Sequence, residues 1–267
     1  MNQGKILLKN EYFLKYQDGV AEVLDFITII GILLVSFSLI GLVSYPVLKN
    51  AQDARYIENT RQSFVVLADK INKVATGQAP SQSLQVKMYG GTLRVTGIST
   101  INITADTSTE KNIPLLPTQT MGSIENSIGD TVVSYEGTGV WVKYPSGTIL
   151  NAYRPIITNM SGILVIPVVH LSGNYATSGN GMSEITVCQQ RIPTEEGGCG
   201  QPIVTHYSNV NNITITITGN YTSGWKDYFT NVMKWNGDTD GVYTGRLNAT
   251  TNLDVYIINS WIRTEIT

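Results

Sequence analysis

The sequence predicts an α+β fold, in which one long hydrophobic helix near the N-terminus precedes a mainly antiparallel β domain with one short helix. Three observations predict it. Residues 26–48 contain no charged residue, several segments after residue 80 alternate between apolar and polar residues, and aromatic residues after position 224 recur at helical spacing. The first pattern is typical of a membrane-spanning helix, the second of half-buried strands, and the third of a helix that packs on a sheet.

The apolar run, FITIIGILLVSFSLIGLVSYPVL, is long enough to cross a membrane. As a helix it reaches about 34 Å at about 1.5 Å per residue, and the hydrocarbon core of a bilayer is about 30 Å thick. A single crossing must be helical, because lipid offers backbone N–H and C=O groups no partners. A buried helix in the core of a soluble domain is the alternative interpretation.

The helix is expected to continue beyond this run, because apolar residues recur three and four positions apart between residues 53 and 75. The stripe consists of Ile57, Phe64, Leu67, Ala68, Ile71, Val74 and Ala75. Pro46 should kink the helix rather than end it, whereas Gly77 and Pro80 are stop signals. We therefore expect one long helix over residues 20–74, apolar all round in its first half and amphipathic in its second.

Composition and motifs exclude several classes of function. Charged residues make up 14% of the 267 residues and the net charge is −2, whereas soluble domains contain about 25% charged residues. No basic patch occurs, so we expect no nucleic-acid partner. G-x-S-x-G, H-E-x-x-H and P-loop motifs are missing, and His170 and His206 have no nucleophile or metal-ligand spacing. We therefore expect neither an enzyme nor a bound metal or cofactor.

Two features indicate that the part after the apolar run lies outside the cell. Cys188 and Cys199 both follow it, and such a pair oxidises in extracellular compartments; two unpaired buried thiols are the alternative. A disulfide between them would close a short loop, which the chain-entropy model values at about 2–3 kcal/mol. Asn-x-Ser/Thr sequons also occur only after the apolar run, so we expect N-glycosylation there. The sequons are Asn102, Asn159, Asn212, Asn220 and Asn248.

Turn residues between alternating runs divide the β domain into strands. Gly90-Gly91 lies between the runs 84–88 and 93–95 and predicts a hairpin. Pro145-Ser-Gly147 predicts a second hairpin. Further strands are expected at 101–104, 131–135, 139–144, 148–151, 162–171, 184–188, 203–207, 212–218 and 253–258.

Two strands and one helix have patterns that predict how they are buried. Residues 165–169 are apolar on both faces and should form a central strand, with Pro167 at a bulge or strand end. ITITIT (213–218) alternates strictly and should have one solvent-facing side. Ser223 is the expected N-cap of the short helix. Its aromatic and apolar stripe, Trp225, Tyr228, Phe229, Val232 and Met233, predicts a core helix; an aromatic ligand-stacking site is the alternative.

The N-terminal region also resembles a known family. GVAEVLDFITIIGILLVSFSLIGLVSYPVLKNAQDARYIENTRQSFVVLADKINKV is similar to the N-terminal region of archaeal type IV pilin-like proteins, and TVVSYEGTGVWVKYP and NITITITGNYTSGWKDYF look similar to less-studied members. The resemblance implies a class III signal peptide, cut by a prepilin peptidase between Gly19 and Val20. Gln17 and Asp18 stand where the family usually has Lys or Arg. It thus implies a leader (1–19), a long helix (20–76) and a β-rich extracellular head (80–267).

This resemblance implies a structural subunit, a major or minor pilin, of a type IV pilus-like surface filament. The precursor would reside in the membrane, and other pilins would be its partners in a helical filament. Glu22 or Asp25 would accept the amine of Val20 on a neighbouring subunit, although both carboxylates could instead lie at the headgroup level. Gly31 and Gly41 would let neighbouring helices approach closely. The alternative is a permanently anchored surface protein whose β domain binds a ligand or cell-wall polymer, for which no cleavage at Gly19 is needed.

Overall fold

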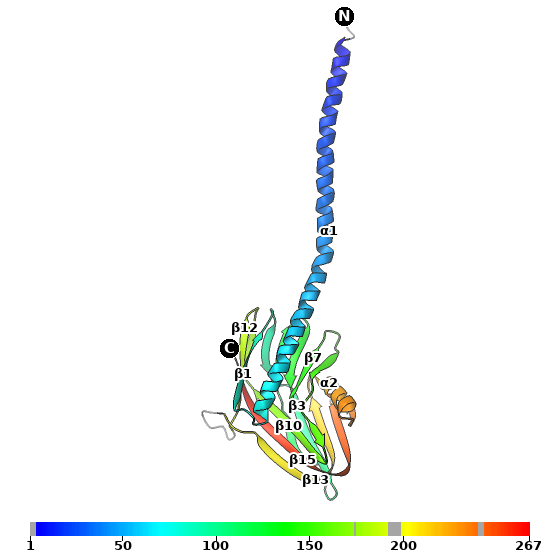
Figure 1. Ribbon diagram of the computed structural model, residues 1–267. Helices are drawn as coiled ribbons and strands as arrows, with labels where there is room; N and C mark the ends of the chain where they lie inside the picture. Colours follow the sequence, from blue (N-terminus) through cyan, green and yellow to red (C-terminus); the bar gives the residue numbers. More distant parts are fainter. Residues whose placement is uncertain (1–3, 174, 192–198, 240–242) are drawn as a thin grey trace. The chain divides into compact units, whose positions relative to one another are not determined.

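The computed structural model describes residues 4–173, 175–191, 199–239 and 243–267, with side chains described from Glu22 onward except at 237–244, 246 and 248–251. The chain divides into two compact units, Met1–Ala54 and Arg55–Thr267. Among the described residues the first unit is helical, and the second holds the end of this helix and all strands (Figure 1). The observed architecture is the predicted one: a long apolar helix, antiparallel sheets and one short helical segment.

Helix α1 spans Gly4–Ala75 and therefore begins before the expected residue 20. Residues 4–19 contain no proline, and an isolated glycine such as Gly19 costs a helix only about 1 kcal/mol, so nothing in this stretch ends the helix. Pro46 lies inside α1 without ending it, as predicted. The C-terminal end is a Schellman cap: Gly77 has φ +76°, its N–H donates to Val74 and the N–H of Gln78 donates to Lys73. The expected glycine stop signal is thus confirmed.

The described strands of the head form two sheets. Sheet A has nine strands and sheet B has six, and all pairs are antiparallel except β10 with β15. In sheet A six strands follow one another in the order β1 (Ser81–Lys87), β12 (Met182–Gln189), β15 (Tyr243–Ile266), β13 (Ile203–Thr218), β3 (Thr100–Thr107) and β4 (Ile113–Thr120). Strands β10 (Ile163–Ser172) and β14 (Asn236–Thr239) pair with β15 as well. Strand β9 (Thr158–Met160) pairs with β10. Sheet B contains β11 (Ala176–Ser178), β2 (Thr92–Thr96), β5 (Ser123–Ile128), β6 (Thr131–Glu136), β7 (Gly139–Lys143) and β8 (Ile149–Tyr153).

The hairpin expected at Gly90-Gly91 is wrong. The turn exists, since Tyr89 and Gly90 both have positive φ and the Gly91 N–H donates to Met88 O. However, β1 pairs with β12 in sheet A, whereas β2 pairs with β5 and β11 in sheet B. The turn therefore carries the chain from one sheet to the other, which a local pattern cannot distinguish from a hairpin. The hairpin at Pro145–Gly147 is confirmed by the pairing of β7 with β8.

The strand patterns are otherwise largely confirmed. Strand β10 is buried over most of its length, as expected, but Pro167 lies in its interior opposite Ile258 and not at a bulge or end. The other neighbour of β10, β9, stops pairing at Val165, so the missing N–H of Pro167 disrupts no ladder there. In β13 the isoleucines of ITITIT are buried and the threonines are half-buried, which confirms the alternation.

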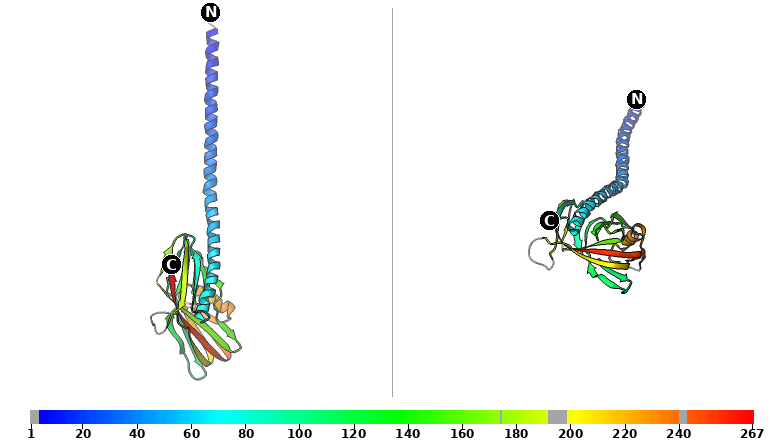
Figure 2. Two further views of the ribbon diagram at one scale, coloured as in Figure 1. Left: turned by 60° about the vertical axis from the view of Figure 1, so that its left-hand side comes forward. Right: turned by 60° about the horizontal axis from the view of Figure 1, so that its bottom comes forward.

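Two hydrophobic clusters fill the head. One contains the C-terminal part of α1, with Phe64, Leu67 and Ile71, between residues of both sheets. The figures show this part of the helix running down between the strands (Figure 2). The predicted stripe is buried there from Phe64 to Ala75, and only Ile57 is half-buried. The amphipathic half of α1 is therefore a core element of the head.

The second cluster lies under the short helical segment, α2 (Thr222–Asp227), which continues as one turn of π-helix, η1 (Tyr228–Val232). The N-cap is Tyr221, without a side-chain cap, and not the expected Ser223. Trp225 and Phe229 are buried, which confirms a core helix. Val232 is 39% exposed because the change to π-helical winding turns it out of the stripe.

Candidate functional site

The first candidate site is the apolar stretch of α1, whose side chains are uncovered. Every described residue from Glu22 to Gln52 is exposed, and the large apolar side chains between Val23 and Leu48 have exposed fractions from 39% (Ile30) to 72% (Leu42). By length and composition this helix could cross a membrane. Exposed apolar area of this extent needs an apolar environment, either lipid or other helices.

The polar side chains within this stretch are adapted to such an environment. The hydroxyls of Thr28, Ser36 and Ser38 each donate to the backbone carbonyl four residues earlier, at 2.5, 2.8 and 2.7 Å. A hydroxyl that is hydrogen-bonded within its own helix avoids the cost of an unsatisfied polar group in an apolar medium. These three hydroxyls can therefore be buried in lipid or protein without losing their hydrogen bonds.

The predicted processing and assembly residues all lie on α1. Gly19 and Val20 are within its helical backbone, and their side-chain surroundings lie outside the described part. Glu22 and Asp25 are exposed. A Cβ added to Gly31 or Gly41 would meet no atom within 4 Å, so neither glycine is required by packing within the subunit. The structure leaves all four described positions accessible to a partner.

Buried polar contacts fix the last turns of α1 in the head. Asn72 donates through Nδ2 to the Thr138 carbonyl at 3.0 Å and accepts from the Tyr135 hydroxyl at 2.9 Å. Burial raises the pKa of Tyr135, which keeps its hydroxyl protonated as a donor. Ser260 donates to the Ala75 carbonyl, one of the free carbonyls of the helix end. The sequence stripe predicted the apolar packing but not this polar anchor.

The predicted disulfide is present. Cys188, in β12, is bonded to Cys199, with a Cα–Cα distance of 5.7 Å. Most of the intervening loop, residues 192–198, lies outside the described residues. A disulfide is typical of an oxidising compartment, which is consistent with an extracellular head.

The predicted glycosylation sites differ in accessibility. Asn159 and Asn220 are exposed. Asn102 and Asn212 are half-buried, and their amides donate to Thr118 and Asp106, respectively. The side chain of Asn248 lies outside the described residues. Accessibility thus favours Asn159 and Asn220 as acceptors, and their glycosylation stays a prediction.

The two histidines are held by local contacts. The Nδ1 and Nε2 atoms of His170 lie 2.6 Å from the Thr120 carbonyl and 2.5 Å from Asn259 Oδ1, and burial lowers the pKa of the ring. His206 stacks on Tyr256 and lies 3.4 Å from the Asp254 carboxylate. Both rings are thus held by contacts within the head.

The face of sheet B that lies toward α2 carries two buried carboxylates, Glu125 and Glu136, that the sequence did not reveal. Glu136, in β6, is fully buried; it accepts from the Trp225 indole at 3.1 Å and from the Ser99 hydroxyl. Burial raises the pKa of Glu136 to about 7, although the two hydrogen bonds lower it in part. Glu136 therefore connects sheet B to α2 through a carboxyl whose pKa lies well above its ordinary value.

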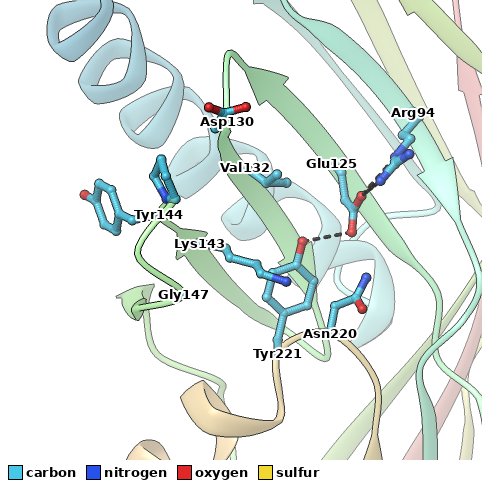
Figure 3. Close-up of a pocket in the computed structure, with 10 residues that line it drawn as sticks. Arg94, Glu125, Asp130, Val132, Lys143, Tyr144, Gly147, Asn220 and Tyr221 are labelled. Atoms are coloured by element: carbon cyan, nitrogen blue, oxygen red, sulfur yellow. Dashed lines mark hydrogen bonds and ion pairs between the residues drawn. The ribbon is translucent and has the colours of Figure 1, made fainter. Parts of the chain in front are cut away.

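On the same face, Glu125 forms one wall of a cavity of about 430 Å³. Arg94 donates two hydrogen bonds to Glu125, at 2.9 and 2.7 Å, and the Tyr221 hydroxyl donates a third at 2.8 Å (Figure 3). The lining residues are Arg94, Glu125, Asp130, Val132, Lys143, Tyr144, Pro145, Gly147, Asn220 and Tyr221. These residues come from β2, β5, β6, β7, the turns after β5 and β7 and the turn before α2, so no local sequence pattern indicates the cavity.

Comparison with known proteins identifies a family. Residues 19–265 match the family of unknown function DUF7289, which covers nearly the whole chain. Neither the curated proteins nor the solved structures contain a match.

Proposed function

We propose that this chain, which belongs to the DUF7289 family, is a structural, non-catalytic subunit of a type IV pilus-like surface filament. The carrying observation is the helix α1. Its apolar part is exposed on all sides, whereas residues from Phe64 to Ala75 are core residues of the head. An exposed apolar helix joined to a folded β domain is the architecture expected of a pilin, major or minor.

The same helix suits both places that a pilin occupies. Before assembly, its apolar side chains would contact lipid, and in the filament they would contact helices of other subunits. Both surroundings are apolar, and the hydroxyls of Thr28, Ser36 and Ser38 are already satisfied within the helix. Transfer between them therefore leaves the hydrogen bonds of these three hydroxyls intact. This adaptation supports assembly through α1.

Three features of α1 support specific contacts between subunits. Gly31 and Gly41 leave room for a neighbouring backbone. Glu22 and Asp25 are exposed at the start of the apolar part and would accept the amine of Val20 from a neighbour, in a contact strengthened by low dielectric. That amine would be created by prepilin peptidase cleavage after Gly19. The region shared with the family begins at Gly19, which is consistent with a leader that ends there.

The test compares filament assembly with membrane insertion in the native organism. Gly31→Leu with Gly41→Leu should reduce the fraction of protein in sheared extracellular filaments by about tenfold, since close helix approach is lost. Glu22→Ala or Asp25→Ala should also reduce it, while membrane insertion stays intact. Val43→Leu is the matched control, because it adds bulk at a 70% exposed apolar position without filling a glycine site.

The same material distinguishes a filament subunit from a permanent anchor. N-terminal sequencing of filament protein should find Val20 as the first residue. An anchor needs only lipid contact, so it would keep Met1, and every helix variant would behave like the Val43→Leu control. That combination of results would refute the proposed function.

A further inference from the structure

The cavity on sheet B, which we name the Arg94 cavity after its lining residues given above, has the features of a built ligand site. It lies entirely within the head unit, and its volume of about 430 Å³ falls in the range of about 300–1,000 Å³ for small-molecule sites. Figure 3 shows side chains from several strands and from the turn before α2 around one space. Nothing in the filament role requires this space.

One wall is rigid and carries fixed hydrogen-bonding groups. The Glu125 side chain is only 2% exposed, and it is held by Arg94 and by the Tyr221 hydroxyl. Burial, together with the Glu125 charge, raises the pKa of Tyr221, so that its hydroxyl stays protonated. Arg94 is half exposed and uses two of its nitrogens on a single Glu125 oxygen. The guanidinium therefore keeps donor capacity for a ligand.

The open side carries polar groups that have no partner in the described part of the chain. Lys143, on β7, extends toward the Tyr221 ring, and Asp130 lies at the turn between β5 and β6 (Figure 3). Neither Lys143 nor Asp130 forms a hydrogen bond or ion pair among the described residues. Val132 and Pro145 add apolar surface to the lining. A ligand with hydroxyl groups and an apolar ring face would satisfy both kinds of surface.

We propose that the Arg94 cavity binds a saccharide. Its charges are balanced, with Arg94 and Lys143 against Glu125 and Asp130, so the site favours a neutral ligand that both donates and accepts hydrogen bonds. A phosphate or carboxylate ligand would meet two carboxylates, and an apolar ligand would leave the charged groups unsolvated. A sugar ring offers hydroxyls to the charged groups and C–H faces to Val132 and Pro145.

The saccharide has two potential sources. Asn220 lies at the rim of the cavity, is exposed and is followed by Tyr221-Thr222, so a glycan attached to it would begin at the cavity mouth. The other source is a saccharide of another cell or surface. The sequon can be removed without changing the cavity lining, because Thr222→Ala leaves the Asn220 amide in place.

The first experiment uses full-length, disulfide-bonded protein in detergent, produced in a host without N-glycosylation. The probes are glucose, galactose, mannose and N-acetylglucosamine, observed by saturation-transfer NMR and titrated for Kd. We expect at least one to bind, and Lys143→Ala and Asp130→Ala each to weaken it by about tenfold through lost charged hydrogen bonds. Lys111→Ala and Glu110→Ala, at exposed positions of the head, are the matched controls and should change nothing.

The second experiment distinguishes the sources with protein carrying a glycan on Asn220. If the attached glycan occupies the cavity, the free sugar no longer binds, and Thr222→Ala restores binding. If the ligand is external, glycosylated protein binds the free sugar as the unglycosylated protein does. The proposal is overturned if no probe sugar binds the unglycosylated protein, if binding survives both Lys143→Ala and Asp130→Ala, or if only inorganic phosphate binds. None of these results depends on filament assembly.

Discussion

The buried carboxyl of Glu136 should make the head less stable as pH rises toward neutrality. Its side chain lies between sheet B and α2, where it accepts from Trp225 and Ser99, while the Trp141 indole donates to its backbone carbonyl. Burial raises the pKa of this carboxyl from its ordinary 4.5 to about 7, and the nearby charge of Glu125 acts in the same direction. Glu136→Gln removes the ionisation and keeps a side chain of the same shape.

The sign and size follow from the two pKa values. The folded protein holds the Glu136 proton up to about pH 7, whereas the unfolded chain loses it near pH 4.5. The stabilisation that this proton provides is therefore complete below pH 4.5 and is lost as pH rises through 7. At about 1.4 kcal/mol per pH unit, the wild type should lose about 3 kcal/mol relative to Glu136→Gln. The lowered pKa of His170 makes the free energy of unfolding rise with pH below its ordinary pKa of 6.5. This effect is common to wild type and Glu136→Gln, so it cancels in their difference.

The assay is urea unfolding of the full-length, disulfide-bonded protein in detergent, followed by tryptophan fluorescence at intervals from pH 4.5 to 8. The indoles of Trp141 and Trp225 hydrogen-bond to Glu136 and so report on this region. The difference in unfolding free energy between wild type and Glu136→Gln should widen across this pH range. Glu110→Gln, an exposed control, should remain parallel to the wild type. A constant difference between Glu136→Gln and the wild type would refute the argument.

Two further predictions concern the stability of the head. Phe64→Ala should lower the free energy of unfolding by about 3–5 kcal/mol because Phe64 is fully buried between the sheets, whereas Val66→Ala, at a 49% exposed position of the same helix, should change it by less than about 0.5 kcal/mol; equal effects in urea unfolding would contradict the placement of this helix. Replacing both Cys188 and Cys199 by Ser should cost about 2–3 kcal/mol, as expected for a disulfide with a sequence separation of 11, and titration of two free thiols in native protein would contradict the bond.

The parts of the fold that depend on local patterns could be predicted from the sequence. The uncharged run 26–48 and the stripe from Phe64 to Ala75 identified the two halves of α1, because helix burial follows a period that the sequence displays. Gly77 identified the end of α1, because a Schellman cap requires a residue with positive φ and glycine adopts that conformation readily. The strand ITITIT was recognisable for the same reason. In each case the signal and the structure involve the same few neighbouring residues.

Pairing between distant segments could not be predicted in this way. The runs around Gly90-Gly91 predict strands, which the structure confirms, but their partners, β12 and β5, are distant in sequence. The sequence does not predict strand β5, SIENSI, because the buried Asn126 interrupts the apolar alternation of Ile124 and Ile128. On the other face, Glu125 is buried by its contacts with Arg94 and Tyr221. A polar residue in a strand is expected to face solvent, because the sequence does not show the distant residue that would satisfy it in a buried position.

The Arg94 cavity is the clearest case of this limit, and the limit has a physical origin. From the sequence alone, Glu125 is expected to lie at the surface, since an ionised carboxylate is rarely buried. Its burial is possible only because Arg94 and Tyr221, 31 and 96 residues away in the sequence, satisfy it in the folded protein. The aromatic stripe after residue 224 predicted that α2 packs on a sheet, but not that the preceding turn would place Tyr221 over a carboxylate. A site whose parts are each satisfied by distant residues has no local pattern, so only the three-dimensional structure reveals it.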